Sequence, residues 1–355
     1  MNKLRIAQVA PLYESVPPKL YGGTERVVSF LTEELVALGH DVTLFASGDS
    51  ITKAKLIPAC ETSLRLNENS IDQLAHHIVL LQLVQEEMDN FDVIHYHIDY
   101  LHYPLSRFAQ TPQLTTLHGR LNIPDLKRLY AIYKDMPVVS ISHAQRKPFP
   151  EINWTETVYH GLPEKLFNPN VKDGKYLAFL GRVSAEKRLD RAIDIAIRSG
   201  IPIKVAAKVD TGDKKYFEQQ IKKLLDHPLV EFVGEIGEGE KEEFLSNAIA
   251  LLFPIDWPEP FGLVMIEAMA CGTPVIAYKN GSVPEIIDHG LTGFIVENQD
   301  EAVMAVKNIG TLKRRDCRRT FEERFTATRM AGNYIKTYYQ VMEGQRSKYD
   351  LKLVQ

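Results

Sequence analysis

The sequence predicts two α/β domains, each built on a doubly wound parallel sheet of the Rossmann-like kind. Three observations lead to this prediction. The chain has 355 residues, which is too long for one small domain. Short β-rich runs alternate with longer amphipathic runs from the first residues onward. A loop-like stretch at 161–175, rich in Pro, Asn and Gly, interrupts this alternation before a new series of runs begins.

The first domain is predicted over residues 1–163. Its opening strand is followed by a run with apolar residues spaced three and four apart, as in an amphipathic helix, and then by a second strand, so the chain starts with a βαβ unit. The strands expected in this domain are 4–9, 41–45, 92–95, 113–117 and 138–142, and the helices are 24–38, 70–89 and 125–134.

The second domain is predicted over residues 164–327 and repeats the architecture of the first without repeating its sequence. Its expected strands are 176–180, 203–207, 230–233, 249–254, 274–277 and 293–296. A final amphipathic stretch, 328–342, is expected to be helical and to pack against either domain. Two such sheets facing each other would leave a cleft between the carboxyl ends of their strands, where open α/β folds bind ligands.

The composition excludes several classes of function. With 42 basic and 46 acidic side chains, the chain has no basic surplus for binding nucleic acid. The one dense basic run, 313–319, is expected to be the solvated face of a helix that at most biases docking to a membrane. Three widely spaced cysteines, and the lack of an apolar run of about 18 residues, favour a protein of the reducing cytoplasm without a membrane-spanning helix.

The most informative stretch begins at Pro258. Its first five residues indicate a rigid loop, and the following run indicates a short helix closed by Gly272. The backbone amides that open this helix belong to Phe261, Gly262 and Leu263. A helix N-terminus attracts phosphate, and the carboxylates of Glu259 and Glu267 on either side of it suit hydroxyl groups. A nucleotide sugar has this layout, with sugar hydroxyls, a diphosphate and a ribose.

Three further turns carry residues suited to the same ligand. Arg182 and Lys187 follow the first strand of the second domain and can clamp a diphosphate with one forked and one point cation. Gly22 and Gly23 follow the first strand of the chain and open a helix, where glycines permit close approach of an anion. His118 stands at the carboxyl end of a strand and is expected to point toward the cleft.

The run from Glu259 to Pro274 resembles the Glu-x7-Glu signature of the retaining GT-B glycosyltransferases, specifically family 4 with its glycogen-synthase-like relatives. The turn at 181–190 is similar to the family's Gly-Arg-x4-Lys-x-x-Asp element, and the turn at 21–26 is similar to its Gly-Gly-x-Glu element. The resemblance implies the GT-B fold, in which two Rossmann-like domains face each other across a cleft. It also implies that the last helix, 328–355, crosses back to the N-terminal, acceptor-binding domain.

The resemblance implies a role for each candidate residue. Arg182 and Lys187 would neutralise the leaving diphosphate, together with the amides at the helix start. Glu259 would orient hydroxyls of the transferred sugar, and Glu267 would bind the ribose. His118 would contact the sugar from the first domain, where many relatives have His-Asp and this chain has His-Gly. The Gly-Gly turn would face the donor phosphate and the acceptor.

These features together predict a hexosyltransferase. It would move a sugar from a nucleoside diphosphate sugar, first UDP and next GDP, to a hydroxyl of a saccharide, lipid-linked or small-molecule acceptor. The resemblance implies retention of the anomeric configuration by same-face attack. No metal or other cofactor is expected, because cations and a helix terminus take its place and no Asp-x-Asp motif occurs. Two alternatives are a catalytically silent nucleotide-sugar-binding module and a nucleotide-sugar epimerase of the same architecture.

Overall fold

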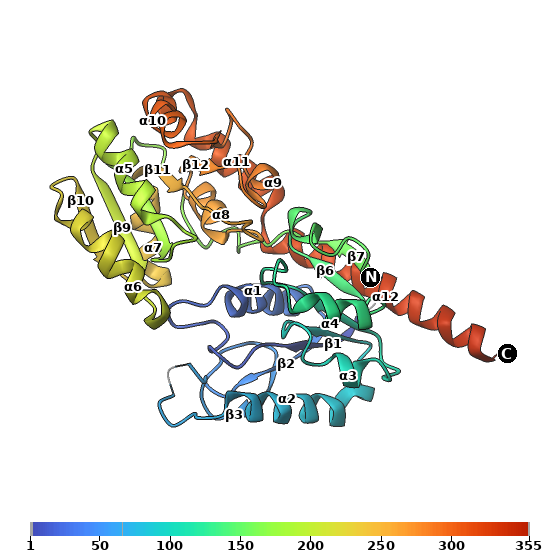
Figure 1. Ribbon diagram of the computed structural model, residues 1–355. Helices are drawn as coiled ribbons and strands as arrows, with labels where there is room; N and C mark the ends of the chain where they lie inside the picture. The colour runs from blue at the N-terminus through green and yellow to red at the C-terminus, as the bar shows by residue number, and fades with distance from the viewer. Residues whose placement is uncertain (1–2, 66, 354–355) are drawn as a thin grey trace. The chain divides into compact units, whose positions relative to one another are not determined.

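The structure, a computed structural model, describes residues 3–65 and 67–353. The chain divides into two compact units. Unit 1 contains the residues up to Gly161 together with the segment from Ala327, and unit 2 contains Leu162–Thr326. Each unit has one parallel sheet with helices packed on it (Figure 1), which confirms the predicted α/β class.

The sheet of unit 1 has seven strands in the order β3-β2-β1-β4-β5-β6-β7, and every neighbouring pair is parallel. Its strands are β1 (Arg5–Val9), β2 (Asp41–Ser47), β3 (Lys55–Cys60), β4 (Val93–Tyr96), β5 (Gln113–Thr116), β6 (Val138–Ser140) and β7 (Trp154–Thr157). Its helices are α1 (Gly23–Ala37), α2 (Gln73–Glu87), α3 (Tyr103–Ser106), α4 (Leu126–Ile132) and α12 (Ala327–Leu353).

Neighbouring residues of β2 show how both faces of this sheet are buried. Leu44 packs in a cluster with Val28 of α1, whereas Phe45 packs in a cluster with Leu80 of α2. Successive side chains of a strand point to opposite faces, so α1 and α2 cover opposite sides of the sheet, as Figure 1 shows. This double cover explains why the strands are nearly continuous apolar runs.

The sheet of unit 2 has six parallel strands in the order β10-β9-β8-β11-β12-β13. Its strands are β8 (Tyr176–Arg182), β9 (Ile203–Lys208), β10 (Val230–Gly234), β11 (Ala248–Phe253), β12 (Val275–Tyr278) and β13 (Gly293–Val296). Its longer helices are α5 (Leu189–Ser199), α7 (Glu238–Ser246), α8 (Leu263–Ala270), α10 (Gln299–Asn308) and α11 (Arg314–Arg324). Ala250 and Leu252 of β11 pack with α5 and α10, so α7 and α8, which also contact β11, cover the other face.

Both sheets have a topological switch point. In unit 1 the chain runs from β1 to β2 and β3 on one side and returns to β4 on the other side of β1. In unit 2 it runs from β8 to β9 and β10 and returns to β11 on the other side of β8. The loops after β1 and β4, and those after β8 and β11, therefore diverge and leave room for a ligand at the carboxyl edge of each sheet.

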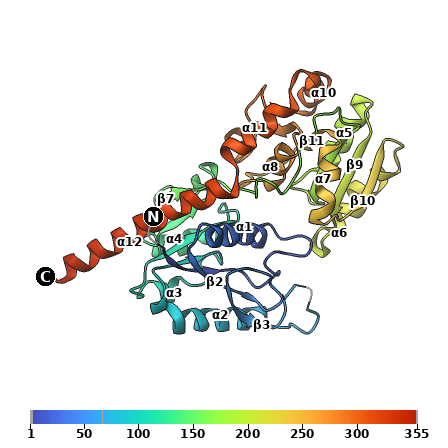
Figure 2. The same cartoon turned by 180° about the vertical axis from the view of Figure 1, so that it is seen from behind.

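Two strands of unit 1 are absent from the sequence-based expectation, namely β3 and β7. Both are edge strands, and their sequences, Lys-Leu-Ile-Pro-Ala-Cys and Trp-Thr-Glu-Thr, are only partly buried. Edge strands have one unpaired side, tolerate proline and lack the apolar run of a central strand. The final helix, expected over 328–355, runs from Ala327 to Leu353 and belongs to unit 1 (Figure 2). It packs against α1, β5 and β7.

The interpretation of the basic run 313–319 as a solvated helix face is wrong for two of its arginines. Arg314 donates to the backbone carbonyls of three other segments, and Arg318 donates to those of Glu164, Phe167 and Ala270. The planar fork of an arginine can satisfy several carbonyls at once. Within the described residues, no helix is long and apolar enough to cross a membrane.

Candidate active site

The centre of the candidate site in unit 2 is an ion pair between Lys187 and Glu259. Lys187 lies in the loop after β8, and Glu259 lies in the loop after β11, so the pair flanks the switch point of this sheet. Trp257 donates its indole N–H to the same carboxylate oxygen, Oε2, at 2.9 Å. The Lys187 ammonium also lies 5.2 Å from the ring centroid of Trp257 and 5.4 Å from that of Phe253, which are cation–π distances.

The loop that carries Glu259 is held by the turn after β12. Gly281 packs so closely that a Cβ there would lie 2.3 Å from the backbone N and O of Glu259, and its φ of 56° is left-handed. Ser282 donates its backbone N–H to the carbonyl of Glu259 at 2.9 Å and its hydroxyl to the carbonyl of Phe261 at 2.7 Å. Only glycine fits position 281. The contacts of Gly281 and Ser282 hold the backbone of the loop that carries Glu259 in place.

The helix start predicted to attract phosphate is formed as expected. Gly262 is the N-cap of α8, and in the described chain no side chain caps its first turn. Phe261 is buried and packs edge-on against Phe325 at 6.3 Å. The buried ring of Phe261 holds the start of α8 in place. The backbone amides of this helix start lie at the carboxyl edge of the sheet, next to the Glu259 loop, where the helix dipole favours a negative charge.

Glu267 lies on α8 with a nearly buried carboxylate. Its Oε1 accepts a hydrogen bond from the Lys241 ammonium of α7 at 2.7 Å. The side chains of Lys241 and Glu267 are 13% and 4% exposed, so the pair is largely removed from water. Lys241 also lies 3.5 Å from Glu238, so one ammonium serves two carboxylates. Lys241 is not among the residues predicted from the sequence, because it lies between glutamates and belongs to no recognisable motif.

Arg182, the last residue of β8, contacts a different set of carboxylates. Its guanidinium lies 3.3 Å from Asp213, 3.7 Å from Glu186 and 4.0 Å from Asp210. These pairs are long and about a third exposed, so each contributes little to stability. Arg182 at the end of β8 and Lys187 in the following loop therefore pair with different carboxylates.

Asp190, the last residue of the segment 181–190, stabilises the loop that carries Lys187. Arg188 stands in the left-handed region with a φ of 54° and donates to both carboxylate oxygens of Asp190. The Tyr216 hydroxyl donates to Asp190 as well, at 2.8 Å. Burial opposes ionisation of Asp190, but these hydrogen bonds outweigh it and lower its pKa. Arg188 also pairs with Asp256 at 3.0 Å, which ties the Lys187 loop to the Glu259 loop.

The predicted Gly-Gly turn lies in unit 1, where Gly22 is the N-cap of α1. A Cβ on Gly22 would lie 2.7 Å from Pro18, so the turn is tightly packed. Glu25 is buried in the first turn of α1, and burial, with a smaller effect of the Glu14 charge, raises its pKa to about 7. Glu14 in turn pairs with Arg65 at 3.2 Å. Two carboxylates therefore accompany the glycines after β1, at the switch point of this sheet.

His118 follows β5 in unit 1, and its surroundings are other histidines. Its Nε2 lies 2.9 Å from Nδ1 of His97, and its ring stacks on that of His160 with centroids 5.3 Å apart. Burial lowers the pKa of His118 to about 3, so the ring is neutral near pH 7. The stacking places the ring of His160, which is not among the predicted site residues, directly beside that of His118.

The site residues thus form two groups. Unit 2 brings Lys187, Glu259 and the start of α8 together and adds Trp257, whereas Glu267 pairs with Lys241. Unit 1 holds Gly22, Gly23 and His118 at the carboxyl edge of its own sheet. Among the described residues, no group of three or more His, Cys, Asp or Glu side chains could hold a metal ion.

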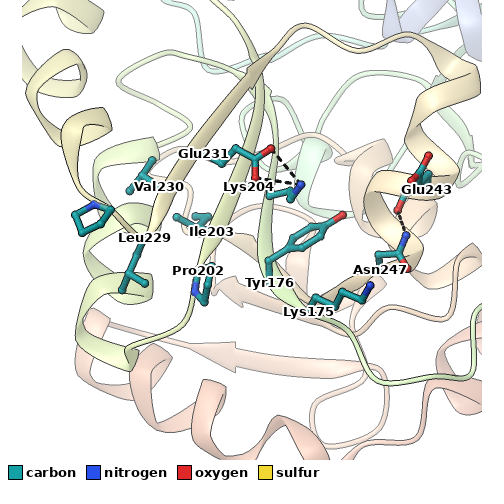
Figure 3. A pocket seen from close by; sticks show the side chains of 11 residues that line it. Lys175, Tyr176, Pro202, Ile203, Lys204, Leu229, Val230, Glu231, Glu243 and Asn247 are labelled. Carbon is teal, nitrogen blue, oxygen red and sulfur yellow. Dashed lines mark hydrogen bonds and ion pairs between the residues drawn. The ribbon is translucent and has the colours of Figure 1, made fainter.

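A cavity of about 420 Å³ lies elsewhere in unit 2 (Figure 3). It is lined by the first residues of three strands, Tyr176, Ile203 and Val230, and therefore lies at the amino edge of the sheet. Lys204 in this cavity pairs with Glu231 at 3.1 Å and lies over the Tyr176 ring. The loops with Lys187 and Glu259 leave from the opposite edge, so this cavity is separate from the candidate site.

Two family models match the chain. The model described as Glycosyl transferases group 1 matches residues 163–325, and the model described as Glycosyltransferase Family 4 matches residues 21–154. These segments contain the site residues of unit 2 and of unit 1, respectively.

Curated relatives match over nearly the whole chain. It is 25% identical to N-acetyl-alpha-D-glucosaminyl L-malate synthase of Bacillus anthracis, over 92% of this chain and 96% of that protein. It is 26% identical to the GDP-mannose-dependent alpha-(1-6)-phosphatidylinositol dimannoside mannosyltransferase of Mycobacterium tuberculosis, over 94% of this chain and 96% of that protein. Among solved structures, HepE of Anabaena in complex with UDP and glucose has the same fold, with a TM-score of 0.74 at 18% identity, over 95% of this chain and 100% of that chain.

Proposed function

The chain belongs to the glycosyltransferases, with a family 4 domain followed by a group 1 domain, and from this premise we propose which residues bind the donor and which contact the sugar and the acceptor. Unit 2 binds the nucleoside diphosphate sugar, with the diphosphate between Lys187 and the start of α8. Unit 1 contributes His118 to the sugar and the Gly22 turn to the acceptor side. The transferred sugar keeps its anomeric configuration.

The observation that carries this proposal is the Lys187–Glu259 pair at the switch point of unit 2, beside the uncapped start of α8. Lys187 supplies a compact positive charge, and α8 supplies backbone amides. Both Lys187 and Trp257 donate to Oε2 of Glu259, so Oε1 is the oxygen that would accept a sugar hydroxyl. A positive charge and a carboxylate acceptor side by side suit the phosphate–sugar junction of the donor.

Charge development explains how these groups would accelerate transfer. As the bond between the anomeric carbon and the phosphate breaks, negative charge grows on the diphosphate. Lys187 and the α8 amides are held in place before the reaction, and preorganised donors of this kind stabilise such charge most effectively. The ion pairs of Arg182 are weak enough to be exchanged for a diphosphate oxygen.

We propose a uridine diphosphate sugar as the donor, with guanosine second. HepE was solved with UDP, and the mycobacterial relative uses GDP-mannose. Thermal unfolding with UDP-, GDP- and ADP-sugars tests this order, because a ligand that binds only the folded chain raises the melting temperature. Release of nucleoside diphosphate in the presence of acceptor sugars then tests transfer. Binding without release would favour the silent module, and an altered sugar on an intact nucleotide would favour the epimerase.

Removal of divalent metal ions is expected to leave transfer unchanged. The positive charges of Lys187 and Arg182 and the start of α8 take the place of a metal at the diphosphate. The measurement is the rate of nucleoside diphosphate release after dialysis against EDTA, with and without added Mg²⁺ or Mn²⁺. A loss of activity that either ion restores would contradict this expectation.

Changing Glu267→Gln is expected to weaken binding of UDP by about tenfold or more, because a hydroxyl loses a charged acceptor. Isothermal titration with UDP measures this change. The control is Glu238→Gln, which removes the other carboxylate of Lys241 and is expected to leave UDP affinity within about twofold. Equal losses in both variants would indicate that Lys241, and not the ribose contact of Glu267, controls affinity.

A further inference from the structure

A chain of buried hydrogen bonds connects His118 to the final helix of unit 1. His118 Nε2 lies 2.9 Å from His97 Nδ1, and His97 Nε2 lies 2.8 Å from Oε1 of Gln8. The amide nitrogen of Gln8 donates to the Tyr338 hydroxyl at 2.9 Å. Gln8 and Tyr338 are fully buried and His97 is 2% exposed, so water does not compete for these contacts.

The same chain continues beyond Tyr338. The Tyr338 hydroxyl lies 2.9 Å from Nδ1 of His95, and Nε2 of His95 lies 2.7 Å from the hydroxyl of Thr116. The Thr116 hydroxyl lies 2.9 Å from that of Tyr334. Tyr334 and Tyr338 stand one turn apart on α12. The final helix therefore contributes two hydroxyl groups to this series of hydrogen bonds.

The hydrogen bonds can be assigned a single direction. Gln8 donates to Tyr338, so the one proton of that hydroxyl goes to His95, and the remaining His95 proton goes to Thr116. On the other side, the carbonyl oxygen of Gln8 requires a proton on His97 Nε2. His97 is neutral, so its Nδ1 accepts, and the proton of His118 must be on Nε2.

The reverse direction is disfavoured. If the Gln8 amide were turned over, its nitrogen would donate to His97 Nε2, and His97 would carry its proton on Nδ1. His97 would then donate to His118 Nε2, so His118 would hold its proton on Nδ1. That atom is buried and has no hydrogen-bond partner among the described residues. A buried N–H without an acceptor is rarer in proteins than a bare acceptor, so the first arrangement is the stable one.

We propose that Tyr338, acting through Gln8 and His97, is a positioning residue that holds His118 as the neutral tautomer with its proton on Nε2. This inference rests on the proposed function in so far as His118 meets the transferred sugar. In this tautomer the free nitrogen, Nδ1, is an acceptor that matches a hydroxyl group of the sugar. Nδ1 is enclosed in this structure, so binding of a sugar hydroxyl there requires the turn at 118–120 to shift.

The test compares two tyrosines of α12. Tyr338→Phe removes the hydroxyl that orients Gln8, whereas Tyr334→Phe removes the last acceptor of the chain and leaves Gln8 held. Both residues are fully buried, so the two changes affect packing alike. The protein is labelled with ¹⁵N-histidine, and the long-range ¹⁵N–¹H correlation of His118 reports its tautomer. His118→Gln identifies the signal among those of the 11 histidines.

The wild-type chain and Tyr334→Phe are expected to show the proton of His118 on Nε2, and Tyr338→Phe is expected to show a mixture of both tautomers. With UDP-glucose as the first donor tested, Tyr338→Phe is expected to lower kcat by about tenfold with little change in KM, as loss of orientation does. A His118 proton on Nδ1 in the wild type, or the same tautomer in all three proteins, would overturn the proposal.

The spectrum and the kinetics test the tautomer and the sugar transfer independently of each other. The tautomer is read without substrate, so it stands even if the chain transfers no sugar and the proposed function is wrong. Conversely, an active wild type with unchanged kcat in Tyr338→Phe would leave the transferase assignment intact and would remove the positioning role of α12.

Discussion

Replacing Lys187 with alanine is expected to lower kcat/KM for sugar transfer by roughly 100- to 1,000-fold, the usual effect of removing one preorganised donor from a developing negative charge. Lys187 is held by Glu259 and by the rings of Phe253 and Trp257. Its ammonium is therefore in place before the donor binds. The measurement is steady-state release of nucleoside diphosphate, with a UDP titration to separate binding from turnover.

The matched control for this variant is Lys204→Ala. Lys204 also pairs with a carboxylate, at 3.1 Å from Glu231, and its ammonium lies 5.0 Å from the centroid of the Tyr176 ring. It lines the cavity at the amino edge of the same sheet (Figure 3). The loops of the candidate site leave from the opposite, carboxyl edge. Lys204→Ala is expected to keep kcat/KM within about twofold. If Lys187→Ala behaved in the same way, the diphosphate site would have to lie elsewhere.

A second variant separates charge from geometry at this position. Lys187→Arg keeps the positive charge, but it replaces the compact ammonium beside Trp257 and Phe253 with a longer, planar group whose charge is spread over three nitrogens. It is therefore expected to recover only part of the lost activity. Recovery to the wild-type rate would mean that the charge alone matters and that the aromatic rings do not position it.

The sequence was sufficient to predict the residues that short strand–loop–helix connections bring together. Lys187 and Glu259 follow neighbouring strands, and parallel sheets place the carboxyl ends of their strands at one edge. The partners of these residues could not be predicted in the same way. Lys241 contacts Glu267 from another helix, and it stands in an acidic segment without a motif that would mark it as a site residue.

The hydrogen bonds that link His118 to Gln8 and Tyr338 could not be predicted from the sequence. Gln8 and Tyr338 are 330 positions apart, yet they share a hydrogen bond. The amphipathic pattern of the last helix predicts that its tyrosines are buried but says nothing of what their hydroxyls contact. The two edge strands escape prediction for a related reason, because half-exposed strands carry a weak apolar pattern.

Replacing Arg314 with alanine is expected to lower the free energy of unfolding of unit 2 by roughly 3 to 5 kcal/mol, because it leaves several enclosed acceptors without a donor. The guanidinium donates to the carbonyls of Asn170, Ser246 and Ala248 at 2.6 to 2.7 Å. It also donates to the Thr273 hydroxyl at 2.6 Å. One side chain thus connects the first loop of the unit to the starts of β11 and β12.

Fluorescence can isolate this effect because the chain has two tryptophans, one in each unit. In a Trp154→Phe background, Trp257 reports the unfolding of unit 2 alone. Arg314→Ala is then expected to lower the melting temperature of this transition by roughly 10 °C. The control is the neighbouring Arg315→Ala, an exposed residue that is expected to change stability by no more than about 0.5 kcal/mol.

Arg314→Lys gives the sharper result, because it keeps the charge of the basic run and removes the fork. A lysine ammonium cannot reach four acceptors that lie in different directions, so this variant is expected to be nearly as unstable as Arg314→Ala. Full stability in Arg314→Lys would mean that the positive charge, and not the hydrogen bonds to the backbone, holds α11 to the sheet of unit 2.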